Sequence, residues 1–283
     1  MIAENQDFIT PHITDSHHLE YPCFNAGWVC EYELPHWDPI HIGNLVLDLS
    51  PTKHVVMLLI AATLCLVTLL LGARAQGRHQ QAGKAPKGFA NGIEALVLYL
   101  RQEVVIPNVG PHGDKYVPFV LTLFFFILFA NLLGLIPYGS TATGNISVTA
   151  TLAILSFIMI EVAGMRTLGP KGYMKTIVYW PSDQSLVMKL MLTPLMTPIE
   201  LAGKFTKPIA LAIRLFANMT AGHIVVLALL GLIFSFGSYF IAPAPFLAAL
   251  GIMLLEIFIG FLQAFVFALL VSVFIGLIRE GAH

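Results

Sequence analysis

Long apolar stretches dominate this sequence. The first runs from Val55 to Gly72 without a charged residue. At about 1.5 Å per helical residue, such a run is long enough to cross a hydrocarbon core of about 30 Å with modest adjustment. Of the 283 residues, 57% are hydrophobic and 11% are charged, with a mean hydropathy of +0.80, whereas soluble domains carry about 25% charged residues. We therefore expect an all-α polytopic membrane protein.

Residues 1–52 have a different character, with eight acidic side chains, no Lys or Arg, and several prolines. We expect an irregular, acidic extramembrane arm there, followed by a membrane domain over residues 53–283. The arm lacks the basic start and early apolar stretch of a signal peptide, so we expect no cleaved leader. Basic residues follow the first span, about 55–72. By the positive-inside rule, the N-terminus then lies outside and the next loop in the cytoplasm.

The middle of the membrane domain predicts three more helices. Apolar residues at three- and four-residue steps predict an amphipathic interfacial helix over about 89–105, ending before Pro107. Two apolar runs, about 117–137 and 145–165, are separated by uncharged turn-forming residues and predict a transmembrane hairpin. The loop after the hairpin is again basic, which agrees with the first orientation and puts the C-terminus on the cytoplasmic side.

The last two apolar stretches, about 186–236 and 243–278, are longer than the roughly 20 residues that a perpendicular span requires. Pro194, Pro198 and Pro208 lie in the first part of the earlier stretch. We expect a second hairpin of two long helices that tilt strongly or bend. The sequence contains no pair of broken helices in inverted repeats, which are typical of secondary transporters.

Ionisable side chains within these last helices are candidates for function, because burying a charge in lipid is costly. Arg214 and Gln263 lie equally far from the predicted turn, as do His223 and Glu256, so each pair should share a depth. Arg214 and His223 are separated by about 13.5 Å of helical rise and by half a turn in phase. Asn218 follows Arg214 by four residues and lies on the same face.

Structural roles compete with functional ones at several of these positions. Arg214 could be a cation satisfied by carbonyls or by Gln263, but it lies too far from either helix end to snorkel easily. A lone histidine is more often a satisfied polar residue than a relay. The carboxylate of Glu256 opposite His223 favours proton exchange. Glu200 could serve as a relay or could simply pair with Lys204 on the helix surface.

Composition excludes several other classes of function. The net charge of −1 offers no basic excess for nucleic acid. We expect no cofactor and no metal, since the three cysteines match no zinc pattern. Cys23 and Cys30 could form a disulfide if the arm faces an oxidising compartment. No phosphate-binding loop occurs, so we expect any ATP chemistry to reside in other subunits and not in this chain.

Three segments closely resemble the signature segments of the ATP synthase subunit a family. They are PIELAGKFTKPIALAIRLFANMTAGH at 198–223, LFFFILFANLLGLIP at 123–137, and LEIFIGFLQAFVFALL at 255–270. The resemblance covers about residues 90–279. It implies that Arg214 is the essential arginine, with Asn218 beside it and Gln263 opposite. It further assigns polar half-channel positions to Glu200, His223 and Glu256, and the hairpin asparagine to Asn131.

The sequence departs from the commonest bacterial pattern at one pair of positions. Many relatives have an acid where this chain has His223 and a histidine where it has Glu256. The two residue types thus appear exchanged, as they are in mitochondrial members of the family. The exchange keeps an acid and an imidazole at one depth. The acidic arm is not part of the family pattern.

The resemblance implies a proton-translocating stator subunit with two offset half-channels, in an energy-coupling membrane such as the bacterial inner membrane. Its implied partners are the rotor ring of subunit c, peripheral-stalk subunits of the b type, and lipid. Two alternatives stay open. A self-contained secondary transporter would move ions without other subunits, and a structural anchor of the stator would affect assembly and not flux.

Overall fold

The computed structural model describes most of the chain, which divides into two compact units. The described residues are 14–22, 29–43, 45–82, 88–136, 139–178, 185–236, 240 and 242–280. Unit 1 contains Met1–Leu66, Phe126–Val148 and Leu215–Gln263. Unit 2 contains Val67–Phe125, Thr149–Arg214 and Ala264–His283.

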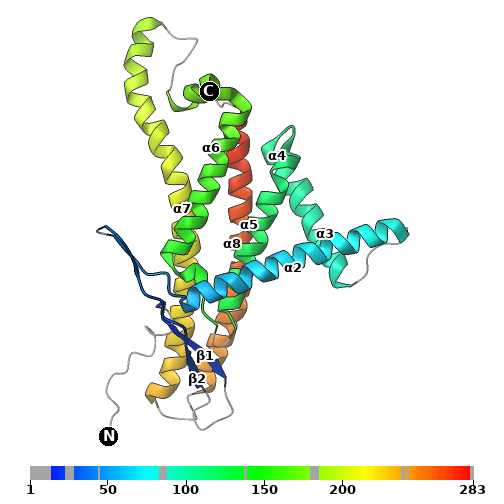
Figure 1. The fold of residues 1–283 in the computed structure, drawn as a ribbon, viewed down its shortest axis with the longest axis vertical. Helices are drawn as coiled ribbons and strands as arrows, with labels where there is room; N and C mark the ends of the chain where they lie inside the picture. The colour runs from blue at the N-terminus through cyan, green and yellow to red at the C-terminus, as the bar shows by residue number, and fades with distance from the viewer. Residues whose placement is uncertain are drawn as a thin grey trace. The chain divides into compact units, whose positions relative to one another are not determined.

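Five helices in the described part of the chain are long and apolar enough to cross a bilayer (Figure 1). They are α2 (Lys53–Ala82), α5 (Val117–Gly134), α6 (Ile146–Ile177), α7 (Leu186–Phe236) and α8 (Pro243–Glu280). This confirms the expected class of helical, multi-pass membrane protein. The lengths of α7 and α8 agree with the two long stretches in the sequence, whereas their tilt stays a prediction.

The arm is not irregular throughout, so that part of the expectation is wrong. It contains two antiparallel hairpins, which β1 (His18–Pro22) forms with β2 (Val29–Glu33) and β3 (Ile40–Ile42) forms with β4 (Leu45–Leu47). Val, Ile and Tyr favour strands. Three prolines are compatible with these hairpins, because Pro22 ends β1 and Pro35 and Pro39 lie outside the strands.

Two further details of the arm bear on the sequence analysis. Cys30 is disulfide-bonded and Cys65 of α2 is buried, whereas Cys23 lies outside the described residues. At the end of the arm, the amide of Ser50 donates to Asp48 Oδ1 at 2.9 Å. Hydrogen bonds from Ser50 hold the pKa of the Asp48 carboxyl group below its usual range. The bond from the side chain has the larger effect and the bond from the backbone the smaller one. The arm therefore keeps this negative charge near neutral pH.

The predicted interfacial helix is longer than expected and changes its winding. It consists of α3 (Phe89–Tyr99), a π-helical segment η1 (Leu100–Val105) and α4 (Ile106–Val109). The expected end before Pro107 is wrong, because the proline occupies the first turn of α4. Proline is tolerated in a first turn, where no amide donor is needed, and the preceding π-helical turn is a common local adjustment within helices. Its place at the membrane interface stays a prediction.

Helix α6 also extends beyond the expected end at 165. It runs to a kink at Gly169, where φ is 69°, and resumes at Pro170. Glycine adopts a positive φ without the steric cost that a side chain would add, and proline suits the start of the second segment. The kink therefore gives α6 a short second segment that ends at Ile177.

One face of α8 is buried along its length. In unit 1 this face carries Glu256, Gly260 and Gln263, which recur at helical steps of four and three residues. In unit 2 it continues with Phe267, Val271 and Ile275. Two polar side chains therefore lie on the same packed stripe as the apolar core residues.

Candidate functional site

His223 of α7 and Glu256 of α8 face one another within unit 1. Their closest atoms, His223 Nδ1 and Glu256 Oε1, lie 3.9 Å apart. The prediction that these two residues share a depth is confirmed. Glu256 is only 2% exposed, whereas His223 is partly exposed. An imidazole and a carboxylate this close can exchange a proton directly or through one water.

Gly222 allows this close approach. A Cβ atom at position 222 would overlap the carboxylate of Glu256. Position 222 therefore carries no side chain, and the carboxyl group of Glu256 packs against α7 in the space that this leaves. By contrast, a Cβ atom at Gly231, two and a half turns further along α7, would meet nothing within 4 Å.

The carboxylate of Glu256 lacks hydrogen-bond donors from the described protein atoms. Both of its oxygens and the hydroxyl of Ser140 are buried without a hydrogen-bond partner among the described residues. Leaving such groups dry is expensive, so buried polar atoms generally have protein or water partners. All three atoms belong to residues that line a cavity of about 240 Å³, which we call the His223 cavity. Its volume and polar lining suit several water molecules.

The connection between α5 and α6 also lines the His223 cavity. The hydroxyl of Thr141 is in hydrogen-bond contact with His223 Nε2. Thr141 can come close to α5 because Gly134 has no side chain; a Cβ atom at that position would overlap the hydroxyl of Thr141. His223 thus has a hydroxyl at Nε2 and a carboxylate near Nδ1. The sequence analysis missed Thr141, since it treated this segment only as a turn; its position within an uncharged segment between two spans was the available signal.

Asn131, the asparagine of the hairpin motif, connects three segments of unit 1. It is fully buried, its amide donates to the carbonyl of Gly260 at 3.0 Å, and its side-chain oxygen accepts from Thr143 at 2.7 Å. It thus ties α5 to α8 and to the short 3₁₀ turn η3 (Ala142–Gly144). These contacts give Asn131 a positioning role for the segment that carries Thr141.

Asn218 and Gln263 also meet across α7 and α8. The amide of Asn218 donates to Gln263 Oε1 at 2.9 Å, and Gln263 is 5% exposed. Arg214 precedes Asn218 by one helical turn, and both residues are exposed. Within unit 2, no described residue has a recorded hydrogen bond or ion pair with Arg214. Because Gln263 belongs to the other unit, the expected match in depth between Arg214 and Gln263 stays a prediction.

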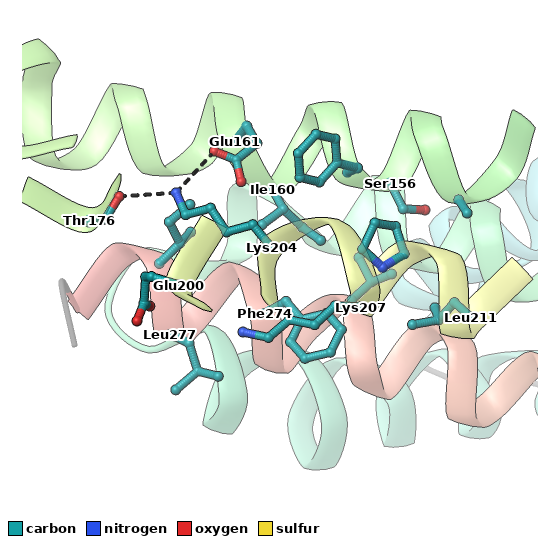
Figure 2. Close-up of a pocket in the computed structure, with 15 residues that line it drawn as sticks. Ser156, Ile160, Glu161, Thr176, Glu200, Lys204, Lys207, Leu211, Phe274 and Leu277 are labelled. Carbon is teal, nitrogen blue, oxygen red and sulfur yellow. Dashed lines mark hydrogen bonds and ion pairs between the residues drawn. The ribbon is translucent and has the colours of Figure 1, made fainter. Parts of the chain in front are cut away.

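A second polar group lies in unit 2, where α7 packs against α6 (Figure 2). Lys204 Nζ lies 3.5 Å from Glu161 Oε2 and donates to the hydroxyl of Thr176 at 3.2 Å. The hydroxyl of Tyr173 also donates to Glu161, and Lys204 lies over the ring of Tyr173, 4.8 Å from its centre. Both ion-pair partners are 13% exposed. This arrangement satisfies a buried charge pair with additional hydrogen bonds.

Glu161 was missed by the sequence analysis, although it is the one acidic residue in the apolar run from Ile146 to Gly164. The sequence offered Glu200 as the neighbour of Lys204, whereas the structure pairs Lys204 with Glu161. Glu200, Lys204 and Lys207 line a cavity of about 150 Å³ in unit 2 together with apolar residues of α6 and α8 (Figure 2). Among the described residues, no group of His, Cys, Asp and Glu side chains has a metal-binding arrangement.

Comparisons with known proteins agree with the segments singled out above. The family model described as ATP synthase A chain matches residues 55–276. ATP synthase subunit a of Myxococcus xanthus is 47% identical over 240 residues, which cover 84% of this chain and 76% of the relative. ATP synthase subunit a of Chloroherpeton thalassium is 43% identical over 94% of this chain and 74% of the relative. ATP synthase subunit a 2 of Chlorobaculum tepidum is 44% identical over 96% and 72%.

Proposed function

The chain belongs to the ATP synthase A chain family, and from this premise we propose that it is the proton-translocating stator subunit of an F-type ATP synthase. In this role it provides two offset half-channels and presents Arg214 to the carboxyl groups of a rotor ring of c subunits. Peripheral-stalk subunits of the b type hold it in place. ATP chemistry occurs in other subunits of the complex.

The physical basis of the mechanism is the cost of moving a charge through lipid. A ring carboxyl group can face lipid cheaply only when it is neutral. A proton from one half-channel neutralises it, the ring turns, and the proton leaves by the other half-channel. Arg214, which is always protonated, favours the ionised carboxylate next to it and so promotes release of the proton there. It also prevents a direct leak between the half-channels.

The observation that carries this proposal is the buried His223–Glu256 pair beside the His223 cavity. Glu256 is 2% exposed, receives no hydrogen bond from the residues that the structure describes, and lines a cavity of about 240 Å³. Water in that cavity would give protons access to the pair. Nine residues separate His223 from Arg214, which in a regular helix corresponds to about 13.5 Å of rise and half a turn in phase. This separation supports an access route that is offset from the site of ring deprotonation.

The positive-inside rule supports one direction for the route. It places the N-terminus and the turn between α7 and α8 on the outer side, and the C-terminus in the cytoplasm. His223 and Glu256 lie nearer that turn than Arg214 does, so we assign them to the outer half-channel. Glu200 belongs to the opposite end of α7, and we assign it to the inner one. The electrical driving force is about 2.3 kcal/mol per charge for each 100 mV.

Replacement of Arg214 tests the proposal. Arg214→Ala should abolish ATP-driven proton pumping in membrane vesicles while the complex still assembles, because no fixed cation then opposes the ring carboxylates. Lys175→Ala, which removes a positive charge from an exposed site on α6, is the matched control and should pump normally. The readout is quenching of a pH-sensitive dye after addition of ATP, with assembly checked by native electrophoresis.

The same measurements separate the alternatives. Normal pumping by Arg214→Ala would remove the central role assigned to this residue. Loss of assembly with the same substitution would favour a structural anchor. Ion flux through liposomes that contain this subunit alone would favour a self-contained transporter.

A further inference from the structure

The N-terminal arm forms part of the wall of the His223 cavity. His18 and Leu19 of β1 line it, together with Lys53 and Met57 at the start of α2. The remaining lining comes from α7, α8 and the connection between α5 and α6. All of these residues belong to unit 1. A segment that precedes the residues matched by the family model therefore contributes to the surroundings of the buried pair.

The cavity joins an exposed surface to a buried acid. His18 is exposed, whereas Glu256 is 2% exposed and its oxygens have no protein donors. Four titratable side chains line the cavity: His18, Lys53, His223 and Glu256. An imidazole ring carries one nitrogen that can donate and one that can accept, which suits a residue at the mouth of a proton path.

Several polar contacts hold the start of β1 against the start of α2. The carbonyl of Ser16 accepts from the amide of Lys53 at 2.9 Å, and His17 Nδ1 lies 3.3 Å from the carbonyl oxygen of Pro51. The amide of His54 donates to Asp15 Oδ1 at 3.2 Å. These contacts hold residues 15–17, just before β1, against residues 51–54 at the start of α2. His18 is the next residue after this held segment.

The imidazole of His54 links this anchor to α6. It is 3% exposed, and its Nδ1 atom lies 3.4 Å from Asp15 Oδ1 and 3.3 Å from Asn145 Nδ2. Asn145 in turn accepts from the amide of Ser147, in the first turn of α6. The arm is thus attached to the same connection that presents Thr141 to His223.

The charge of the arm suits cation entry. Residues 1–52 contain eight acidic side chains and no Lys or Arg. A surface of one sign raises the local concentration of oppositely charged ions near an opening. We therefore expect the acidic arm to attract protons and other cations to the outer side of the protein.

We propose that the N-terminal arm builds the outer entrance of the proton path, with His18 at its mouth and the Asp15–His54 contact as the device that holds it there. This inference rests on the proposed function, since it assigns an entrance to the same path. Asp15 and His54 are positioning residues, and His18 is the residue that protons pass.

Chemical labelling of the assembled ATP synthase tests the entrance. His18→Cys is introduced, the purified complex is treated in detergent with a bulky methanethiosulfonate, and the complex is then reconstituted into liposomes. The labelled variant should lose most of its ATP-driven pumping and its proton-driven ATP synthesis, and cleavage of the adduct by a reducing agent should restore both. Val46→Cys, at a 59% exposed site on β4 outside the cavity lining, is the matched control and should retain both activities when labelled. Labelled parent protein measures the background from its own cysteines.

The Asp15–His54 contact is tested separately. Asp15→Ala should slow proton flux and shift its pH profile, whereas Asp15→Asn keeps an acceptor oxygen for the His54 amide and should retain most of the flux. Equal effects of the two variants would contradict the holding role.

Arg214→Ala is measured alongside to separate this inference from the proposed function. If labelled His18→Cys pumps like the unlabelled parent while Arg214→Ala is inactive, the entrance is elsewhere and the proposed function stands. If Arg214→Ala pumps normally, the proposed function itself fails.

Discussion

Gly222 determines how closely the carboxylate of Glu256 can approach α7. The carboxyl group occupies the space that a methyl group at position 222 would need. His223, the next residue, faces the same carboxylate at 3.9 Å. The geometry of the candidate proton-transfer pair therefore depends on one missing side chain.

We predict that Gly222→Ala displaces Glu256 and impairs proton transfer. Overpacking of this kind costs about 1–3 kcal/mol, so the melting temperature of the assembled complex should fall along with ATP-driven pumping. Gly231→Ala is the matched control, because the added methyl group meets nothing within 4 Å and alanine stabilises a helix by up to about 1 kcal/mol relative to glycine. Equal behaviour of the two variants would show that the close approach at Gly222 is unimportant.

We also predict that the pair matters more than the identity of either site. His223→Ala or Glu256→Ala should slow proton flux, by about 100-fold or more if the lost group transfers protons directly, and should change the pH profile. The exchange His223→Glu with Glu256→His keeps an acid and an imidazole at one depth and should be tolerated better than either loss. Rates of dye quenching across a pH series measure this. An exchange as damaging as a single loss would contradict the paired site.

At the scale of elements, Lys204 joins α7 to both segments of α6. Glu161 precedes the kink at Gly169, whereas Tyr173 and Thr176 follow it. The ion pair and its hydrogen bonds therefore fix the angle of the kink as well as the packing of the two helices. Removing only one partner of such an ion pair is costly, because the other charge then remains without its counterion.

A double-mutant cycle should reveal this coupling. Lys204→Met alone should destabilise the subunit by about 3–5 kcal/mol, because it leaves Glu161 buried without its cation. The double variant Lys204→Met with Glu161→Gln should recover a large part of that loss. The free energy of unfolding in mixed micelles provides the measurement. Strict additivity of the two single changes would mean that the ion pair contributes no coupling.

The sequence predicted elements best where the physical signal is local. The lengths of α7 and α8 followed from continuous apolar runs, and the meeting of His223 with Glu256 followed from their equal distances from the turn. The ion pair between Lys204 and Glu161 was not predicted, because Glu161 lies on another helix and helical spacing describes one helix at a time. The hairpins of the arm were missed because proline and acidic residues obscured short strand signals. Pro107 was read as an end because a π-helical turn leaves no local mark in the sequence.

At the scale of the whole molecule, the account depends on where charges lie along α7. Lys204 is paired within unit 2, His223 meets Glu256 within unit 1, and Arg214 is an exposed cation on the same helix. No described residue of unit 2 pairs with this guanidinium, and a cation within an apolar span is costly in lipid, so we propose that a partner from outside the chain satisfies it. The rotor carboxylates are the partner that the proposed function provides.

A density map of the complete ATP synthase, at a resolution that shows side chains, tests this central claim most directly. We predict that the guanidinium of Arg214 faces the ring and lies within about 4 Å of a rotor carboxylate or joins it through one ordered water. A guanidinium that points into lipid, or that is satisfied by stator side chains away from the ring, would contradict the account.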